Sequence, residues 1–164
     1  MSFRVKIFAQ ISHLNVFISW VDKLDIDNCD EHLRSQNSLI DLNNIRWLLE
    51  NAIAINPGWE KGSLYAAMMS VHLNDLSGDK DSERRALEYF ELADRAAKGY
   101  NIGIYVTLAE SFAVSKQDKA YFLELIDKAL TIDISKDKDM KQANTLSKLR
   151  AAWLLTRVDD LFYM

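Results

Sequence analysis

The stretch FELADRAAKG (90–99) decides the predicted fold, because two other segments, ENAIAINPG (50–58) and IDKALTIDI (126–134), end in a similar way. An alanine recurs at corresponding positions of the three segments, at spacings of 41 and 36 residues. Helical hairpins repeat with comparable periods, about 34 residues in tetratricopeptide units and about 40–47 in related arrays. We therefore predict stacked antiparallel helical hairpins, a tetratricopeptide-like α–α superhelix, with a generic helical bundle as the alternative.

Side chains around these alanines fit the packing of such hairpins. Ala93 and Ala129 are small, which lets the first helix of a pair approach the second closely. Phe90 and Phe122 are large enough to fill the gap to the next pair. This alternation of small and large residues favours stacked hairpins over a closed bundle.

Breaks in the helical pattern are few, since the 164 residues include one proline and five glycines. Pro57, Gly58, Gly78 and Gly99 punctuate the chain at near-regular intervals. Between the breaks, apolar residues recur three and four positions apart, as on one face of a helix. The pattern predicts an all-α fold with about seven helices, over 3–24, 38–56, 59–74, 82–98, 101–114, 119–132 and 141–162.

Length and composition indicate a single helical-repeat domain over 1–164, in which residues 1–36 form an N-terminal helix and an acidic linker and 37–162 form the repeats. Hydrophobic residues make up 49% of the chain and its net charge is only −4, which excludes intrinsic disorder and disfavours a nucleic-acid partner. No apolar run is long enough for a direct membrane span. The chain as given shows no secretory signal or lipoprotein cleavage site, which leaves a cytoplasmic location open.

The acidic linker contains residues that invite a metal interpretation. An EF-hand loop starting at Asp25 needs glycine at its sixth position and glutamate at its twelfth, where this chain has Asp30 and Gln36. Cys29 and His32 supply only half of a zinc site. A solvated linker is the favoured interpretation, and no metal site is predicted.

Catalytic motifs are not recognisable in the sequence. His13 and His72 lie within helical apolar stripes without a nearby carboxylate in sequence, which is typical of packed or rim histidines. No nucleophile elbow, metalloprotease, P-loop or dinucleotide motif occurs. We expect neither an enzyme nor a cofactor.

Aromatic residues are the better candidates for a functional role. They fall on the helices expected to line the inner face of a superhelix, where such proteins bind extended partners or ligands. Packing in the core is the alternative for each of them. The predicted lining of a ligand or partner groove consists of Trp59, Tyr65, Tyr100, Tyr105, Phe112 and Trp153.

From Leu42 to Phe162 the chain resembles the TRAP transporter T-component (TatT) proteins. The resemblance rests on an ordered run of motifs, of which the C-terminal block is the most specific. The run comprises LLENAIAIN (48–56), a tryptophan-containing helix, the Ser77-Gly78-Asp79 loop, RRALEYFELA (84–93), KGYNIG (98–103), VTLAESFAV (106–114), KQDKAYFLELIDKAL (116–130) and QANTLSKLRAAWLLTRVDDLF (142–162).

This resemblance implies a non-catalytic, periplasmic lipoprotein that accompanies the substrate-binding subunit of a TRAP transporter. It implies a small hydrophobic ligand, exchanged with that subunit, and a homo-oligomer, a trimer with hydrophobic pores. Compared with the family, the chain is short at its N-terminus. We expect self-association through residues 3–24 or the C-terminal helix. The alternatives are a cytoplasmic adaptor that binds a peptide or protein, and a protein that binds a small ligand alone.

Overall fold

The structure is a computed structural model that describes residues 37–75 and 81–163. The described residues from 42 onward form one compact unit. All regular structure in the described ranges is helical, so the all-α fold predicted from the sequence is confirmed. The predicted helix at 3–24 and the acidic linker that follows it, up to residue 36, lie outside the described residues.

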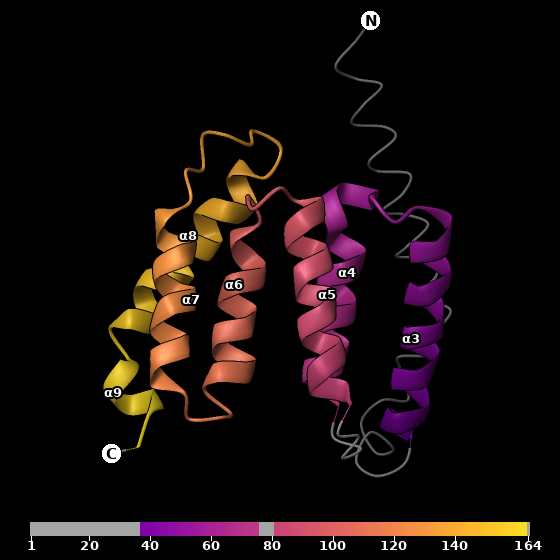
Figure 1. The fold of residues 1–164 in the computed structure, drawn as a ribbon, viewed down its shortest axis with the longest axis horizontal. Coiled ribbons are helices and arrows are strands. Elements are labelled where there is room, and N and C mark those ends of the chain that lie inside the picture. Colours follow the sequence, from indigo (N-terminus) through magenta and orange to yellow (C-terminus); the bar gives the residue numbers. More distant parts are fainter. Residues whose placement is uncertain (1–36, 76–80, 164) are drawn as a thin grey trace, which may run out of the picture. The chain divides into compact units, whose positions relative to one another are not determined.

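The first described helix, α3 (Asn37–Ile55), ends directly before Asn56 and Pro57 (Figure 1). Proline disfavours helical geometry in the residue that precedes it, so the helix ends where the sequence predicts. Two of its large apolar side chains, Ile45 and Trp47, are exposed.

The segment after Gly58 differs from the prediction of one helix over 59–74. The structure has a short 3-10 turn, η2 (Trp59–Gly62), followed by α4 (Ser63–Leu73). Glu60 and Lys61 have φ angles of 41° and 55°, in the left-handed region, which interrupts the right-handed helix. The spacing of apolar residues does not predict such a turn. Contacts with residues far away in the chain hold the turn in place.

At Gly62 the backbone comes very close to the neighbouring helix. Its φ is +85°, and a Cβ built on it would lie 2.7 Å from the Cβ of Ala96 and 3.3 Å from the Cα of Ala93. Both alanines belong to α5 (Ser82–Ala96), which packs along α4 (Figure 1). Ala93 is fully buried and gives the close approach that the sequence predicts for it.

The next helix pair begins at Asn101, whose side chain accepts a hydrogen bond from the N–H of Gly103 at 3.1 Å and caps α6 (Ile102–Leu108). This helix continues into a π-helical turn, η3 (Ala109–Ala113). The N–H of Val114 donates to the carbonyl five residues earlier, at 3.2 Å. The sequence predicts a continuous helix here, and the π turn is a local widening of it.

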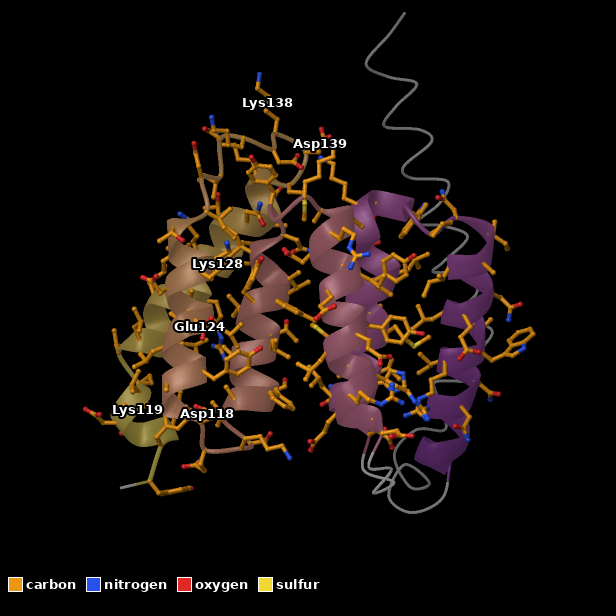
Figure 2. All side chains as sticks on the ribbon, viewed as in Figure 1. Asp118, Lys119, Glu124, Lys128, Lys138 and Asp139 are labelled. Atoms are coloured by element: carbon orange, nitrogen blue, oxygen red, sulfur yellow. The ribbon has the colours of Figure 1, made fainter. Side chains whose placement is uncertain are left out.

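Asp118 caps α7 (Lys119–Thr131), which begins where the sequence predicts a helix. Its carboxylate accepts a hydrogen bond from the N–H of Tyr121 at 2.9 Å. Figure 2 shows Asp118 at this end of α7, with Glu124 and Lys128 further along the helix. Both of those side chains are exposed.

The C-terminal segment also differs from the predicted single helix over 141–162. The structure has α8 (Lys141–Leu155), a tight turn and a short α9 (Val158–Leu161). This turn brings Phe162 against Phe122 of α7, with ring centres 5.1 Å apart. Burial of Phe162 explains the break, because a continuous helix would carry this side chain onward instead of back to α7.

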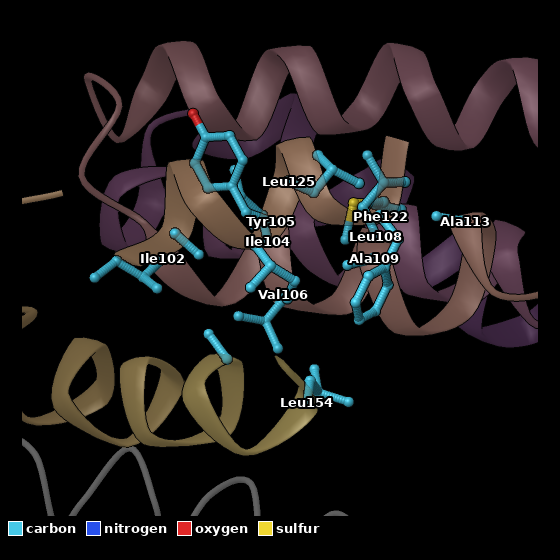
Figure 3. Packing of buried hydrophobic residues seen from close by; sticks show 14 of the residues in the cluster. Ile102, Ile104, Tyr105, Val106, Leu108, Ala109, Ala113, Phe122, Leu125 and Leu154 are labelled. Carbon is cyan, nitrogen blue, oxygen red and sulfur yellow. The ribbon is translucent and has the colours of Figure 1, made fainter. Parts of the chain in front are cut away.

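The core lies where α6, α7 and α8 pack on one another (Figure 3). Phe90 of α5 meets Tyr105 of α6 edge-on, with ring centres 5.3 Å apart. Phe90 and Phe122 therefore make contacts with the following elements, as predicted. Fully buried members of this core include Ile102, Leu108, Ala109, Phe122, Ile126 and Ala151.

Among residues 37–75 and 81–163, no helix combines the length and the apolar content needed to cross a membrane.

Candidate functional site

The predicted aromatic residues occupy three kinds of environment. Tyr105 is buried in the core. Tyr65, Tyr100 and Phe112 are half-buried and pack against it. The two tryptophans, one on η2 and one on α8, are exposed. These six side chains thus belong to several local clusters of the described residues.

Tyr105 is fixed by a hydrogen bond inside the α5–α6 interface. Its hydroxyl donates to the Oδ1 of Asp94 at 2.5 Å, and Phe90 packs edge-on against its ring. Burial raises the pKa of the Tyr105 phenol, and the Asp94 carboxylate raises it further. The phenol therefore stays neutral and acts as a donor. Asp94 is half-buried in this contact.

Tyr65 belongs to a stack of rings between α4 and α5. Its ring centre lies 6.4 Å from that of Tyr89, and His72 stacks on Tyr89 at 5.6 Å with an interplanar angle of 11°. Burial raises the pKa of the Tyr89 phenol, and the nearby Glu50 carboxylate adds to this effect. His72 is buried, as expected for a packed helical histidine.

A buried ion pair lies beside this stack and joins α3 to the end of α4. The Asp75 side chain is 2% exposed, and its Oδ2 contacts the Nη2 of Arg46. The same oxygen accepts a hydrogen bond from the Ser82 hydroxyl at 2.7 Å. A buried carboxylate needs such partners, because an unpaired charge is costly to bury. No sequence motif pointed to this group, since its members lie far apart in the chain.

Phe112 lies on the π turn and contacts α7. Its ring meets that of Tyr121 edge-on at 6.3 Å, and the Lys116 ammonium lies 5.9 Å from its centre. Burial raises the pKa of the Tyr121 phenol. These contacts stabilise the α6–α7 connection.

Trp153 is exposed on α8 and has two guanidinium groups near its ring. The Arg150 guanidinium carbon is 4.4 Å from its ring centre, and that of Arg157 is 5.7 Å away. Both distances are within the range of cation–π attraction. Glu110 of the π turn holds Arg150, accepting from its Nε at 2.9 Å. The sequence singles out Trp153 but neither arginine as a contact of its ring.

Metal-ligating residues do not gather in the part of the chain that the structure describes: no group of three or more His, Cys, Asp or Glu side chains there could hold an ion. Cys29, His32 and His13 lie outside the described residues.

Comparison with known proteins assigns the chain to a family. The family model described as TRAP transporter T-component matches residues 18–162, which include every described helix. The chain belongs to the TRAP transporter T-component family. This match starts upstream of Leu42, where the recognisable motifs begin.

A curated relative of this T-component is an uncharacterized protein of Treponema pallidum (strain Nichols), 25% identical over 115 residues. The aligned region covers 70% of this chain and 36% of the relative, so the chain spans about a third of that protein's length. No solved structure matches. The family is described as a component of TRAP transporters.

Proposed function

We propose that this protein is a non-catalytic accessory or scaffold protein of a TRAP-type transporter and binds the periplasmic substrate-binding subunit. One observation carries the proposal: the T-component family match extends over residues 18–162 and includes all the helices described above. An all-helical fold with exposed aromatic and leucine side chains supports a role in protein binding.

The ligand exchanged with that subunit would be a small hydrophobic molecule. Half-buried aromatic side chains at Tyr65, Tyr100 and Phe112 support this class of ligand, because their rings offer apolar contact area next to the core. The full proposed lining remains the six aromatic residues named from the sequence, with Trp59, Tyr105 and Trp153 as the other members.

A periplasmic location and a homo-oligomer, a trimer by family resemblance, complete the proposal. Fractionation of the native organism should recover the protein with the periplasm or its membranes, and native mass spectrometry should show a defined oligomer. Recovery in the cytoplasm would favour the alternative, an adaptor that binds a peptide or protein.

Calorimetric titration of the chain with the substrate-binding subunit of a TRAP transporter from the same organism tests the central claim. Saturable binding at micromolar concentration is the expected result. A substrate-binding protein from an unrelated transporter class is the control and should give no heat of binding. Absence of binding to the TRAP subunit would contradict the proposal.

Native mass spectrometry of the gently purified protein tests the ligand. The expected result is a co-purified apolar small molecule that organic extraction removes. A spectrum of the bare polypeptide alone, from cells that express the whole transporter, would count against a hydrophobic ligand.

A further inference from the structure

The residues of η2 have a backbone geometry that they do not favour on their own. Glu60 and Lys61 have φ angles of 41° and 55°, and Gly62 follows at +85°. Left-handed geometry is strained for a residue that carries a Cβ, and such strain persists only where surrounding contacts impose it. A run of three left-handed residues, two of them strained, therefore needs a restraint from elsewhere in the molecule.

The local sequence favours a different conformation of the same residues. Its apolar spacing predicts a helix from residue 59, whereas α4 begins at Ser63 and is preceded by Gly62, which has no side chain to cap it. In a helix that begins at residue 59, Gly58 would be an acceptable cap. Glu60 would then lie in the first turn, where a negative charge stabilises the helix dipole. Local preference thus favours right-handed geometry at 59–62.

An ion pair with a distant loop supplies the restraint. The Nζ of Lys61 lies 2.5 Å from both carboxylate oxygens of Asp137 and 3.2 Å from the Oδ2 of Asp139. The side chains of Lys61 and Asp139 are 37% and 86% exposed, so solvent and dissolved ions reach this pair. An ion pair of this kind contributes little to stability and opens at low cost. The pair of Arg46 with the buried Asp75 is of the opposite kind.

We propose that residues 59–62 are a two-state switch, with the ion pair between Lys61 and Asp137 as its clamp. With the clamp closed, the segment is the left-handed turn of the structure. With the clamp open, the segment becomes the first turn of α4, and Trp59, an exposed member of the proposed ligand lining, moves with it. A charged group that competes for Lys61 or Asp137 binds the open state better and shifts the equilibrium towards it. The switch itself does not depend on the proposed function.

NMR of the whole chain tests the switch, because the three-bond coupling between amide and α protons reports the φ angle of a residue. Lys61→Met removes the clamp, and Asp137→Asn removes its negative charge but keeps an acceptor for the N–H groups of the loop. Both variants should change the coupling of residue 61 from the left-handed to the right-handed helical value. Lys98→Met is the matched control, since Lys98 also has a left-handed φ, 54°, but lies just beyond α5. Residue 98 should keep its left-handed coupling, because hydrogen bonds within its own turn hold it.

Two further measurements distinguish a switch from a clamp that only adds stability. Glu60→Gly, combined with Lys61→Met, should shift the coupling of residue 61 back towards the left-handed value, because glycine adopts a positive φ without strain and disfavours a helix. In the wild-type chain, sodium chloride at about 1 M should shift the same coupling partway towards the helical value, because salt screens an exposed ion pair.

Thermal melts establish that each variant is folded. A left-handed coupling that persists in Lys61→Met and in the wild type at high salt overturns the switch, because the packing around Gly62 alone would then hold the turn. A coupling averaged over many conformations overturns it as well, because the open segment would not be helical. Either result leaves the proposed function standing, and failure of the wild-type chain to bind the substrate-binding subunit leaves the switch standing.

Discussion

Single residues of this protein constrain the fold most strongly where a side chain satisfies the backbone of another element. Asn144 of α8 is 1% exposed and bonds to the start of α6. Its Oδ1 accepts from the N–H of Ile102 at 3.0 Å, and its Nδ2 donates to the carbonyl of Tyr100 at 2.7 Å. The N–H of Ile102 lies in the first turn of α6 and has no partner within that helix, so the Asn144 side chain supplies the acceptor that it lacks.

Replacing Asn144 with alanine should lower the free energy of unfolding by about 2–3 kcal/mol, because two backbone groups, one of them buried, lose their partner. Urea denaturation followed by circular dichroism measures the change. Gln142→Ala, at an exposed position one half-turn earlier, is the control and should change stability by less than about 0.5 kcal/mol. A loss no larger than that of the control would show that water replaces both bonds.

Gly62 and Gly58 form a natural pair for a second test. Gly62→Ala should destabilise the protein by about 2 kcal/mol or more, since it combines a positive φ with a Cβ contact of 2.7 Å to Ala96. Gly58 has a φ of −92° and its nearest side-chain atom is 4.0 Å away, so Gly58→Ala should be neutral or slightly stabilising. Thermal melts measure the stability of both variants, and Gly62→Ala should have the lower melting temperature. Equal melting temperatures would contradict the geometry described for this turn.

Between elements, the left-handed turn of η2 is tied to the loop that precedes α8. The Nζ of Lys61 lies 2.5 Å from both carboxylate oxygens of Asp137 and 3.2 Å from Asp139. Asp137 also accepts the N–H of Asp139 at 3.1 Å, which shapes the loop before α8. Lys138 and Asp139 mark this loop in Figure 2. The bond to Lys61, the loop's N–H groups and the positive charge together lower the pKa of the Asp137 carboxyl.

This pKa shift has a definite sign. A carboxyl with a lower pKa in the folded state stabilises the protein fully above its ordinary pKa of 3.8, and the contribution disappears as pH falls through the lower folded value. Lys61→Met should therefore reduce stability at neutral pH and flatten the fall in stability below about pH 4. Denaturation midpoints measured across the acid range provide the test. Lys128→Met, at an exposed position of α7, should keep the wild-type acid profile.

Element boundaries show which parts of the fold a sequence can predict. Pro57 and Asp118 act on their own neighbours, so the end of α3 and the start of α7 could be predicted directly. The turn at η2 and the break before α9 depend on Lys61 meeting Asp137 and on Phe162 meeting Phe122. Such contacts join residues far apart in the chain. The local spacing of apolar residues therefore does not predict them.

The same limit applies to the candidate surfaces. Aromatic residue type and helical position were enough to select Trp153, but the bond that holds its neighbour Arg150 to Glu110 depends on how the α6 segment meets α8. Tyr105 was selected on the same grounds, and its burial with Asp94 depends on how α5 meets α6. Sequence reasoning could find the candidate side chains but not their environments.

For the molecule as a whole, burial differs between the first described helix and the later ones. Ile102 and Leu108 of α6 and Phe122 and Ile126 of α7 are fully buried, whereas Ile45 and Trp47 of α3 are exposed. Opening α6 or α7 exposes the core and so requires nearly the full unfolding free energy, while α3 can open at lower cost.

Hydrogen exchange should therefore be slowest in α6 and α7 and faster in α3. Mass spectrometry of peptides from the labelled full chain measures this order. Denaturant added at low concentration should leave the α3 rates nearly constant and accelerate those of α6 and α7, because only global unfolding exposes the latter. Equal protection of α3 and α6 would contradict this order.

The π turn at 109–113 holds one residue more than an α-helical path would need. A relative that lacks this extra residue would keep a continuous helix, but Glu110 would then be rotated by about 100° relative to one side of the turn and would leave Arg150. Helices normally do not tolerate the insertion or deletion of a single residue. The π turn makes such a change tolerable at this place. Alignments of distant members should carry a one-residue gap at this place, and its presence or absence would separate members that orient the α8 tryptophan from those that do not.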